Sequence, residues 1–418
     1  MSDMNHGKVC LVMVGLPARG KSTIAARLQE NLEKNRILTA VFNNGDLRRS
    51  MITDNTSYAS FYDPQNKESL AIRERIARIN IANARRYLDN GGQVAILDAT
   101  HVSGKRRELI SEMLSGYPVL FIECISTDQD ILEASIAKKA TLSEFEHLTF
   151  EEAKASFKKR IAYYEHIYTP FSWEGNTVRF DSLNNRILQA RISEAIPHYE
   201  QIRDLLVTDS VKNLFLLRHA ESEDNVLNRI GGDAPLTARG RGQAERLGSH
   251  FRDTCLPYIF CSGKRRTIQT SEPICRQQQC DSIVISLAEF DEIDSGVCEG
   301  MSYQEIKEKM PDVYMSRLRD KYNYIYPQGE GYVTMRPRID RGIKKALFLS
   351  GNAENVAIIG HRAVNRMILS HFLYRRMEDV PYIYVPLERY YHIVSTQQKK
   401  LFELKWFTDP GEEHGLDG

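Results

Sequence analysis

The chain has 418 residues, enough for two domains of ordinary size that each have a hydrophobic core. Its formal net charge is +1 at pH 7, so the composition does not favour non-specific binding to nucleic acid or to an acidic membrane. No apolar run approaches the ~20 residues of a membrane-spanning helix, and the first residues do not resemble a signal peptide. The seven cysteines lack CxxC or Cys/His spacing, which predicts reduced thiols in the cytoplasm and neither a disulfide framework nor a zinc site.

In the first half of the chain, short apolar runs alternate with longer amphipathic segments. The runs predict strands at 9–14, 37–42, 94–97 and 119–125, and the amphipathic segments predict helices at 21–34 and 67–89. This alternation is typical of βαβ units, and therefore of an α/β domain with a mainly parallel sheet. A long helical pattern at 185–206 closes this half, and residues 207–211 are expected to form a linker.

The same pattern restarts after the linker. Strands are predicted at 214–217, 258–261, 283–287 and 356–359, and helices at 238–252, 264–278 and 364–374. We therefore expect two α/β domains, at 1–210 and 211–418, each with its own sheet. The last dozen residues are polar and acidic, and are expected to be frayed.

A glycine-rich segment follows the first predicted strand. Residues 15–22 read Gly-Leu-Pro-Ala-Arg-Gly-Lys-Ser and fit the pattern G-x-x-x-x-G-K-[ST]. Backbone N–H groups of such a loop point at phosphate oxygens, while Lys21 is expected to reach the terminal phosphates and Ser22 to bind Mg²⁺. The segment predicts an ATP site formed by Gly15, Leu16, Pro17, Ala18, Arg19, Gly20, Lys21, Ser22 and Thr23.

Asp98 comes directly after the predicted strand 94–97, where an acid faces the usual ligand crevice of a parallel sheet. It is expected to organise Mg²⁺ or to accept the proton of an attacking hydroxyl, with helix capping as the alternative. Two basic clusters, Arg48-Arg49 and Lys105-Arg106-Arg107, also follow strand ends. They are suited to hold a phosphorylated acceptor through charge-assisted hydrogen bonds, or else they are solvated helix faces.

Two histidines follow strand ends in the second half. His219 stands in Leu-Leu-Arg-His-Ala-Glu-Ser at 216–222, and His361 follows the predicted strand 356–359. Because these strand ends meet at one sheet edge, one histidine is expected to take a phosphoryl group and the other to stabilise it, while Arg218 and Arg266 neutralise its charge. A purely structural role for the histidines is the alternative.

The leaving alkoxide in such a reaction needs a proton donor. The acidic loop 289–294, Glu-Phe-Asp-Glu-Ile-Asp, supplies candidates, because crowded carboxylates and a nearby phosphate raise the pKa of one of them.

These motifs, taken in order, resemble the bifunctional 6-phosphofructo-2-kinase/fructose-2,6-bisphosphatase family across residues 8–406. Besides the segments already quoted, the matching stretches are Phe-Asn-Asn-Gly-Asp-Leu-Arg-Arg at 42–49, Asp-Ala-Thr at 98–100, Arg-Ile-Gly-Gly-Asp at 229–233, Lys-Arg-Arg-Thr-Ile-Gln-Thr at 264–270, Glu-Ile-Asp-Ser-Gly-Val-Cys-Glu at 292–299 and Tyr-Pro-Gln-Gly-Glu at 326–330. The resemblance implies a P-loop kinase domain followed by a histidine-phosphatase domain like that of phosphoglycerate mutase. It also implies synthesis of fructose 2,6-bisphosphate from fructose 6-phosphate and ATP, and hydrolysis of that product.

The resemblance assigns roles to single residues. Asp98 is the implied catalytic acidic residue of the kinase, with Lys21 and Ser22 on ATP and Mg²⁺. The implied fructose 6-phosphate contacts are Arg48, Arg49, Arg73, Thr100, Arg106, Lys139, Arg160 and Tyr164.

In the phosphatase half His219 is the implied nucleophile and Glu292 the proton donor, while His361 and Arg218 stabilise the transferred group. The implied bisphosphate pocket comprises Arg218, Asn225, Gly231, Arg266, Glu292, Tyr303, Arg317, Lys321, Tyr332, Arg362 and Arg366.

The chain departs from the family pattern at four places. Ala220 replaces a glycine, which costs about 1 kcal/mol if that position needs a left-handed backbone. Arg362 stands where glutamine is usual and adds a cation, and Ser126 replaces a cysteine. A family lysine that meets the sugar phosphate falls on Lys139 or Ala140, and we expect Lys139.

The family also implies a homodimer through the kinase halves. Three other functions remain open: one active head only, an end-healing polynucleotide kinase joined to a phosphatase, and a nucleotide-binding sensor without catalysis. The near-zero net charge disfavours the polynucleotide enzyme, and the complete set of catalytic residue types disfavours the sensor.

Overall fold

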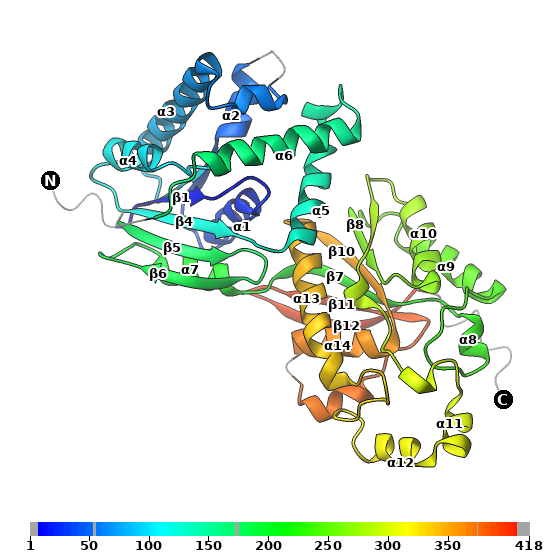
Figure 1. Cartoon of the computed structure of the whole chain (residues 1–418). Helices are drawn as coiled ribbons and strands as arrows, with labels where there is room; N and C mark the ends of the chain where they lie inside the picture. Colours follow the sequence, from blue (N-terminus) through cyan, green and yellow to red (C-terminus); the bar gives the residue numbers. More distant parts are fainter. Residues whose placement is uncertain (1–6, 53–55, 172–174, 374, 408–418) are drawn as a thin grey trace. The chain divides into compact units, whose positions relative to one another are not determined.

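A computed structural model describes residues 7–52, 56–171, 175–373 and 375–407 (Figure 1). The chain divides into two compact units, Met1–Thr208 and Asp209–Gly418. Each unit has a six-stranded sheet, which confirms the prediction of two α/β domains. In the part of the chain described, no helix has the length and apolar character needed to cross a membrane.

The first unit is built on a mainly parallel sheet with strand order β2-β3-β1-β4-β5-β6, in which only β6 runs antiparallel to its neighbour. Its strands are β1 (Val9–Val14), β2 (Thr39–Asn43), β3 (Val94–Asp98), β4 (Val119–Ile125), β5 (Asn176–Asp181) and β6 (Arg186–Arg191). Its helices are α1 (Lys21–Lys34), α2 (Asn44–Met51), α3 (Lys67–Asp89), α4 (Gly104–Met113), α5 (Gln129–Ala140), α6 (Phe150–His166) and α7 (Tyr199–Val207), with the 3₁₀ helices η1 (Ala59–Tyr62) and η2 (Ser143–Phe145).

Helices cover both faces of this sheet. Side chains alternate along β1, so Leu11 packs with α1 and α7 on one face, while Val12 packs with α3 and α4 on the other. All six residues of β1 are buried as a result. This is why β1 reads as a continuous apolar run, as central parallel strands do.

The predicted helix at 185–206 is wrong. The chain forms β6 and then α7 there. Strand β6 pairs with β5, a strand that the local sequence did not predict. The pairing overrides the helical periodicity, and Pro197 stands two residues before α7, where a continuous helix would be interrupted. Because α7 includes Val207 and the next strand starts at Val211, the segment between the last helix of the first unit and the first strand of the second is 208–210, shorter than the predicted linker 207–211.

The second unit has strand order β12-β11-β7-β10-β8-β9, in which β7, β10, β8 and β9 are parallel and β11 is antiparallel to both of its neighbours, β7 and β12. Its strands are β7 (Val211–Arg218), β8 (Tyr258–Cys261), β9 (Ile283–Ser286), β10 (Asn355–Gly360), β11 (Arg389–Ser395) and β12 (Lys400–Trp406). Its helices are α8 (Glu223–Val226), α9 (Ala238–His250), α10 (Arg265–Arg276), α11 (Tyr303–Lys309), α12 (Pro311–Arg319), α13 (Tyr332–Ser350) and α14 (Arg362–Leu373), with η3 (Ala288–Phe290), η4 (Gly296–Cys298) and η5 (Met377–Tyr382).

In this unit α9 and α10 cover one face of the sheet, where Leu247 and Ile274 pack on Phe215 and Leu217. Helix α14 contacts β7, and α13 packs on α14. The parallel strands β7 and β10 end together, with Arg218 opposite Gly360, so the residues that follow them share one edge of the sheet. The expected frayed end lies mostly in 408–418, outside the described residues.

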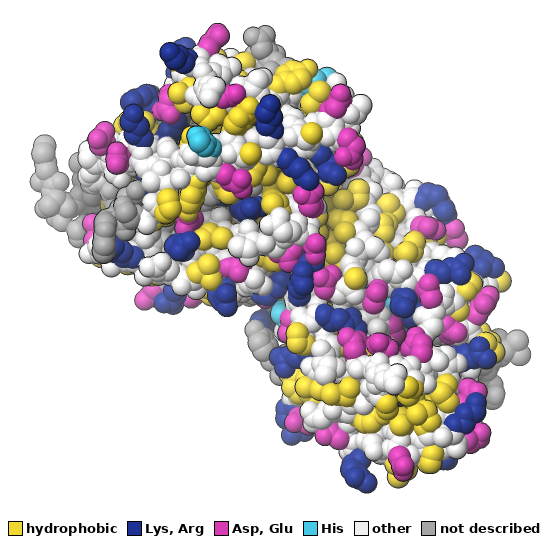
Figure 2. Space-filling model, viewed as in Figure 1, with side chains coloured by type: hydrophobic (Ala, Val, Ile, Leu, Met, Phe, Trp, Pro, Cys, Tyr) yellow, Lys and Arg dark blue, Asp and Glu magenta, His cyan; other side chains and the backbone are white. Residues whose placement is uncertain are grey.

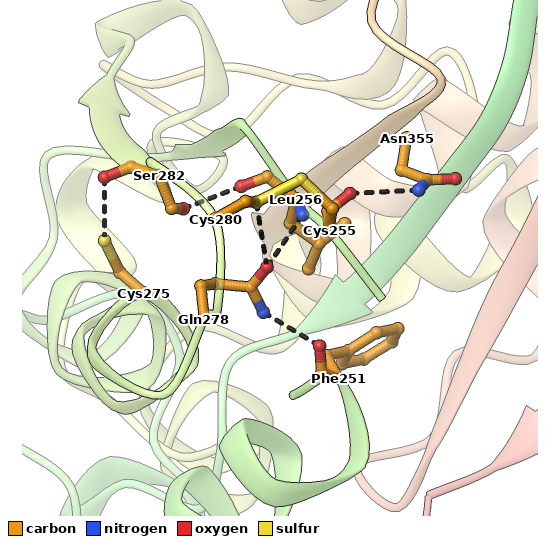
Figure 3. Close-up of a disulfide and its surroundings, with 8 residues drawn as sticks. All are labelled: Phe251, Cys255, Leu256, Cys275, Gln278, Cys280, Ser282 and Asn355. Atoms are coloured by element: carbon orange, nitrogen blue, oxygen red, sulfur yellow. Dashed lines mark hydrogen bonds between the residues drawn. A yellow bond between two sulfur atoms is a disulfide. The ribbon is translucent and has the colours of Figure 1, made fainter. Parts of the chain in front are cut away.

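The prediction of reduced cysteines is wrong at one pair. Cys255 and Cys280 form a disulfide with a Cα–Cα distance of 5.7 Å (Figure 3). Cys255 precedes β8 and Cys280 precedes β9, and these strands are neighbours in the sheet. Sequence spacing did not reveal the pair because the parallel pairing of β8 and β9 brings together two loops that are 25 residues apart. The other five cysteines are free.

Candidate active sites

The glycine-rich loop of the first unit joins β1 to α1, as predicted. Gly15 has a φ of 134°, and a Cβ there would lie 2.5 Å from the carbonyl oxygen of Cys124. Gly20 also has a left-handed backbone, with a φ of 77°, directly before α1. Side chains rarely tolerate either condition, so the glycines let the loop curl closely against the sheet and leave the N-terminus of α1 open to an anion.

Lys21 lies in the first turn of α1 and is almost fully buried. Its Nζ atom donates to the carbonyl oxygen of Leu16 at 2.6 Å. Burial lowers the pKa of Lys21 to about 8, against the attraction of Asp98. A buried ammonium whose partner is a neutral carbonyl gains strongly from an anion, which fits this lysine to a nucleotide's phosphates.

Asp98 ends β3 and is buried at the same sheet edge as the loop, because β3 pairs with β1. Asn43, at the end of β2, donates its side-chain amide to the Asp98 carboxylate. The carboxylate is therefore held in place by a residue that sequence reasoning missed. The signal was available, since Asn43 ends an apolar strand inside the stretch Phe-Asn-Asn-Gly-Asp.

A cavity of about 590 Å³ opens beside Lys21, Ser22 and Asp98. All the residues of the first half that were predicted to bind fructose 6-phosphate line this cavity. These residues are Arg48, Arg49, Arg73, Thr100, Arg106, Lys139, Arg160 and Tyr164. Lys139 lines the cavity, whereas Ala140 packs in a hydrophobic cluster with Phe157 and Ile161, so only the former side chain is placed to meet a ligand.

The arginines around this cavity differ in the partners that they already have within the protein. Arg48 is buried and donates to the hydroxyl of Tyr62 and to Glu144, and Arg106 donates to Glu74. Arg160 stacks 3.9 Å above the Tyr62 ring. Arg107 is fully buried and donates to backbone carbonyls, among them that of Val102 at 2.9 Å. Arg107 therefore supports the loop and is neither a ligand contact nor part of a solvated helix face.

His101 is a second residue that sequence reasoning missed. It lines the cavity, is 3% exposed and has a left-handed backbone with a φ of 43°. Among the described residues neither of its ring nitrogens has a hydrogen-bond partner. Burial and the nearby Arg106 and Lys21 lower its pKa well below the ordinary value, so the ring is neutral. Ser126, at the family's cysteine position, is buried as well, and its hydroxyl has no hydrogen-bond partner in the described part of the chain.

In the second unit the two predicted histidines meet. His219 follows β7 and His361 follows β10, and their ring centroids lie 5.2 Å apart. The His219 backbone N–H donates to the Gly360 carbonyl at 3.0 Å, which extends the strand pairing by one residue. Both rings are buried. Burial and the nearby arginines lower the pKa of each well below its ordinary value, which favours the neutral form of both rings.

Arginines surround the histidine pair. Arg266, at the start of α10, donates from Nε to His361 Nδ1 at 3.3 Å and from Nη1 to the Gly232 carbonyl at 2.8 Å. Burial, and then the like charge of Arg362, lower the pKa of Arg218 to about 9. Such uncompensated positive charge is suited to a phosphoryl group in transit.

Glu292 is the acid of this site. Its Oε2 atom lies 3.8 Å from His361 Nδ1. Burial raises its pKa, although Arg266 and Arg218 oppose this. Of the other acids in the loop, Glu289 pairs with Lys345 at 2.7 Å and Asp291 accepts from the Gly263 N–H at 2.7 Å. Among the acids of the loop 289–294, Glu292 is the one that lines the cavity beside His219.

A cavity of about 390 Å³ adjoins His219, and the predicted bisphosphate residues all line it. They are Arg218, Asn225, Gly231, Arg266, Glu292, Tyr303, Arg317, Lys321, Tyr332, Arg362 and Arg366. Arg317 donates to the Tyr303 hydroxyl at 2.8 Å, and Arg366 donates to that of Tyr332 at 3.1 Å. These tyrosines aim a second group of cations into the cavity, so that both ends of a doubly phosphorylated ligand can be bound.

Two of the departures from the family pattern can now be placed. Ala220 is buried and is not among the residues with a left-handed backbone, so its methyl group causes no backbone strain. Arg362 is an exposed part of the cavity wall, and within the described residues it has neither an ion pair nor a hydrogen bond.

The two sites define a P-loop kinase followed by a histidine phosphatase. Comparison with known proteins agrees: a 6-phosphofructo-2-kinase family model matches residues 1–203, and a histidine phosphatase superfamily (branch 1) model matches residues 214–408. The chain is 34% identical over 396 residues to 6-phosphofructo-2-kinase/fructose-2,6-bisphosphatase of Aquarana catesbeiana, covering 92% of this chain and 82% of that protein. It is likewise 34% identical to enzyme 1 of Mus musculus and 31% identical to enzyme 3 of Homo sapiens, covering 81% and 74% of those proteins. The chain belongs to the 6-phosphofructo-2-kinase/fructose-2,6-bisphosphatase family.

Proposed function

We propose that the domain at 1–210 transfers a phosphoryl group from ATP to the 2-hydroxyl of fructose 6-phosphate, and that the domain at 211–418 removes that group again. The observation that carries this proposal is the separate cavity in each unit, lined by that unit's own catalytic and cationic residues. One preparation should form an acid-labile sugar bisphosphate from labelled ATP and fructose 6-phosphate, and should release phosphate from fructose 2,6-bisphosphate.

In the kinase, the glycine-rich loop and Lys21 bind the ATP phosphates, and the Asp98 carboxylate accepts the proton of the attacking 2-hydroxyl. The Ser22 hydroxyl and Asp98 both line the cavity, and such oxygen donors suit Mg²⁺. When bound with ATP, Mg²⁺ neutralises charge on the phosphates.

The cations farther from the loop bind the sugar's existing phosphate. Arg49 is half exposed and can turn to a ligand. Burial lowers the pKa of Lys139, so an arriving phosphate stabilises its charge. These side chains hold the sugar in place while Asp98 acts on its hydroxyl.

In the phosphatase, Nε2 of His219 attacks the 2-phosphate, forming a P–N bond as the P–O bond to the sugar breaks. Glu292 gives its proton to the leaving oxygen. Arg218, Arg266 and His361 stabilise the charge on the phosphoryl group. Water then attacks phosphorus while the Glu292 carboxylate accepts its proton, and the P–N bond breaks to release phosphate and restore both groups.

The other functions have less support. On the face that Figure 2 shows, basic and acidic side chains are interspersed, which does not suit a nucleic-acid groove. Labelled ATP and an oligonucleotide with a free 5′ end would detect a polynucleotide kinase directly. ATP binding without either turnover would indicate a sensor, and the loss of one activity alone would indicate a single active head.

We also propose that the chain forms a homodimer. Strand β6 is an edge of the first sheet, and Leu188 and Ile192 at this edge are exposed. An unprotected edge with apolar side chains is suited to pairing with a second copy. Sedimentation should show a dimer, and Leu188→Lys should shift it toward monomer.

We also propose that the enzyme acts in the cytoplasm, on the proposed substrates ATP and a sugar phosphate. A redox-responsive pair can exist there, so the Cys255–Cys280 disulfide is compatible with this location. Cell fractionation tests this location, and the protein is expected in the cytoplasmic fraction.

A further inference from the structure

Ser262 is a buried residue whose hydroxyl contacts the ring of His361 in the phosphatase site. It is the first residue after β8 and is fully buried. Its hydroxyl oxygen lies 2.8 Å from Nε2 of His361 and 2.8 Å from the hydroxyl oxygen of Thr267. It also accepts a hydrogen bond from the backbone N–H of Lys264 at 3.1 Å. The side of His361 that faces away from Glu292 is therefore in contact with this serine.

The direction of these hydrogen bonds follows from Arg266. The Nε atom of a guanidinium always carries a hydrogen, so it can only donate. Since it lies 3.3 Å from His361 Nδ1, that nitrogen must accept and carries no proton. A neutral imidazole has one N–H group, so the proton is on Nε2, which donates to Ser262.

The hydroxyl of Ser262 is then fully used. It accepts from His361 Nε2 and from the Lys264 N–H, and it donates to Thr267. Thr267 in turn donates to the Lys264 carbonyl at 2.8 Å. The reverse arrangement, with Ser262 donating to Nε2, would put a proton on Nδ1 opposite the Arg266 N–H, which is two donors facing each other. Only one tautomer of His361 satisfies all of these groups.

We propose that Ser262 is a positioning residue for the phosphatase, which holds the Nε2 proton of His361 inside the protein and thereby presents Nδ1 to the transferred phosphoryl group. The Nδ1 atom lies on the side of Glu292 Oε2, 3.8 Å away, and the His361 ring adjoins that of His219. A phosphoryl oxygen only accepts hydrogen bonds. When one occupies the site, Arg266 turns to it, and Nδ1 takes up one proton from the bulk solvent, so that the ring becomes an imidazolium whose Nδ1 donates to the phosphoryl oxygen while Nε2 keeps its bond to Ser262.

This inference rests on the proposed phosphatase reaction and is tested with Ser262→Ala in the full chain. Phosphatase kcat should fall by about 10- to 100-fold, as expected for loss of a group that orients a catalytic histidine, while KM changes by less than about threefold. The synthesis of fructose 2,6-bisphosphate by the same preparation reports on folding. Ser262→Thr keeps the hydroxyl and should restore most of the rate.

Ser286→Ala is the matched control. The Ser286 hydroxyl donates to the backbone carbonyl of Ser262 at 2.9 Å, so the variant removes a neighbouring hydroxyl without touching His361. Its kcat should stay within about twofold of that of the original chain. An equal loss in both variants would show a general packing effect and overturn the proposal.

The tautomer itself gives a readout that does not require turnover. With ¹⁵N-labelled histidine, His361 of the empty enzyme should show protonated Nε2 and unprotonated Nδ1, and inorganic phosphate should protonate Nδ1. In Ser262→Ala the Arg266 N–H still holds Nδ1 as an acceptor, so the proton should stay on Nε2, but the ¹⁵N shift of Nε2 should change because its hydrogen bond to Ser262 is lost. An unchanged Nε2 shift together with unchanged kcat in Ser262→Ala would refute the role of Ser262. Absence of hydrolysis by the original chain, with the tautomer as described, would instead refute the proposed reaction.

Discussion

The Nδ1 atom of His219 lies 2.8 Å from the carbonyl oxygen of Ala220. A carbonyl only accepts, so Nδ1 carries the proton of the neutral ring and the lone pair is on Nε2. The nitrogen that we propose as the nucleophile is thus set by the backbone of the next residue.

His219→Ala should therefore abolish hydrolysis of fructose 2,6-bisphosphate, by at least about 10³-fold, and leave synthesis intact. Both rates are measured on one preparation. His250→Ala is the control, because His250 is a half-buried histidine of the same unit that contacts Tyr390; it should hydrolyse normally. Normal turnover by His219→Ala would disprove the assignment of the nucleophile.

Asp98→Ala should give the opposite result. Loss of the carboxylate that accepts the hydroxyl proton should lower kinase kcat by about 10²- to 10⁴-fold, with hydrolysis unchanged. Asp89→Ala serves for comparison, because Asp89 accepts from Tyr117 at the surface end of α3. If Asp98→Ala still made the bisphosphate at half the original rate, another group would have to be the base.

Arg362→Gln removes a cation of the phosphatase cavity that has no ion pair among the described residues. The KM for fructose 2,6-bisphosphate should rise by about 3- to 10-fold and depend less on salt concentration, since a partly exposed charge is screened. Steady-state hydrolysis at two ionic strengths measures both effects. Arg376→Gln, an exposed position 14 residues on, should change neither; an unaltered KM in Arg362→Gln would show that this cation does not contact substrate.

The Cys255–Cys280 disulfide closes a loop with a sequence separation of 25 residues. Replacing both cysteines by serine should lower the free energy of unfolding of the second unit by about 3 kcal/mol, from the added freedom of the unfolded chain. Urea unfolding with and without reductant measures this. Cys275→Ser, at a free and partly buried thiol, should not change the response to reductant. Identical stability of the original chain in both conditions would contradict the prediction.

His371 should make the stability of the second unit depend on pH. Burial by itself lowers its pKa, but hydrogen bonds with Asp209 and Asp340 outweigh this and raise the pKa to about 9. Both carboxylates lie 3.3 Å from the ring, and Lys344 also pairs with Asp209. The folded pKa lies above the unfolded value of about 6.5. The stabilisation is therefore complete below pH 6.5 and is lost as the pH rises to 9.

The expected loss in the free energy of unfolding over this range is roughly 3 kcal/mol. Hydrogen exchange of α14 amides measures the stability of this unit as the pH rises. His371→Gln should remove the dependence and His250→Gln should not. Equal slopes in His371→Gln and the original chain would assign the effect to other groups.

Sequence patterns predicted the parallel core and the main site residues because both depend on local rules. The strand β1, the loop at Gly15 and the helix α1 are adjacent in sequence, and each has a characteristic composition. Buried apolar strands likewise marked the ends at which Asp98, His219 and His361 stand. The family resemblance extended this to cations far apart in the chain, such as Arg73 and Arg160.

Other features depend on contacts between distant segments. Strand β6 forms because it pairs with β5, although its own residues fit a helical period. The disulfide depends on the alignment of β8 and β9. Asn43 and Ser262 belong to common residue types, and only their positions beside Asp98 and His361 give them a role. Which acid of the loop 289–294 lines the cavity, Glu292, depends on the folded position of each carboxylate.

Each unit contains its own full cavity, so one chain carries one synthetic and one hydrolytic site. When synthesis balances hydrolysis, the enzyme concentration appears in both rates and cancels. The steady concentration of fructose 2,6-bisphosphate then depends on the two sets of kinetic constants and on substrate levels. A cell that doubled the amount of this protein would reach the same level sooner, whereas a single change in either cavity would alter the level itself.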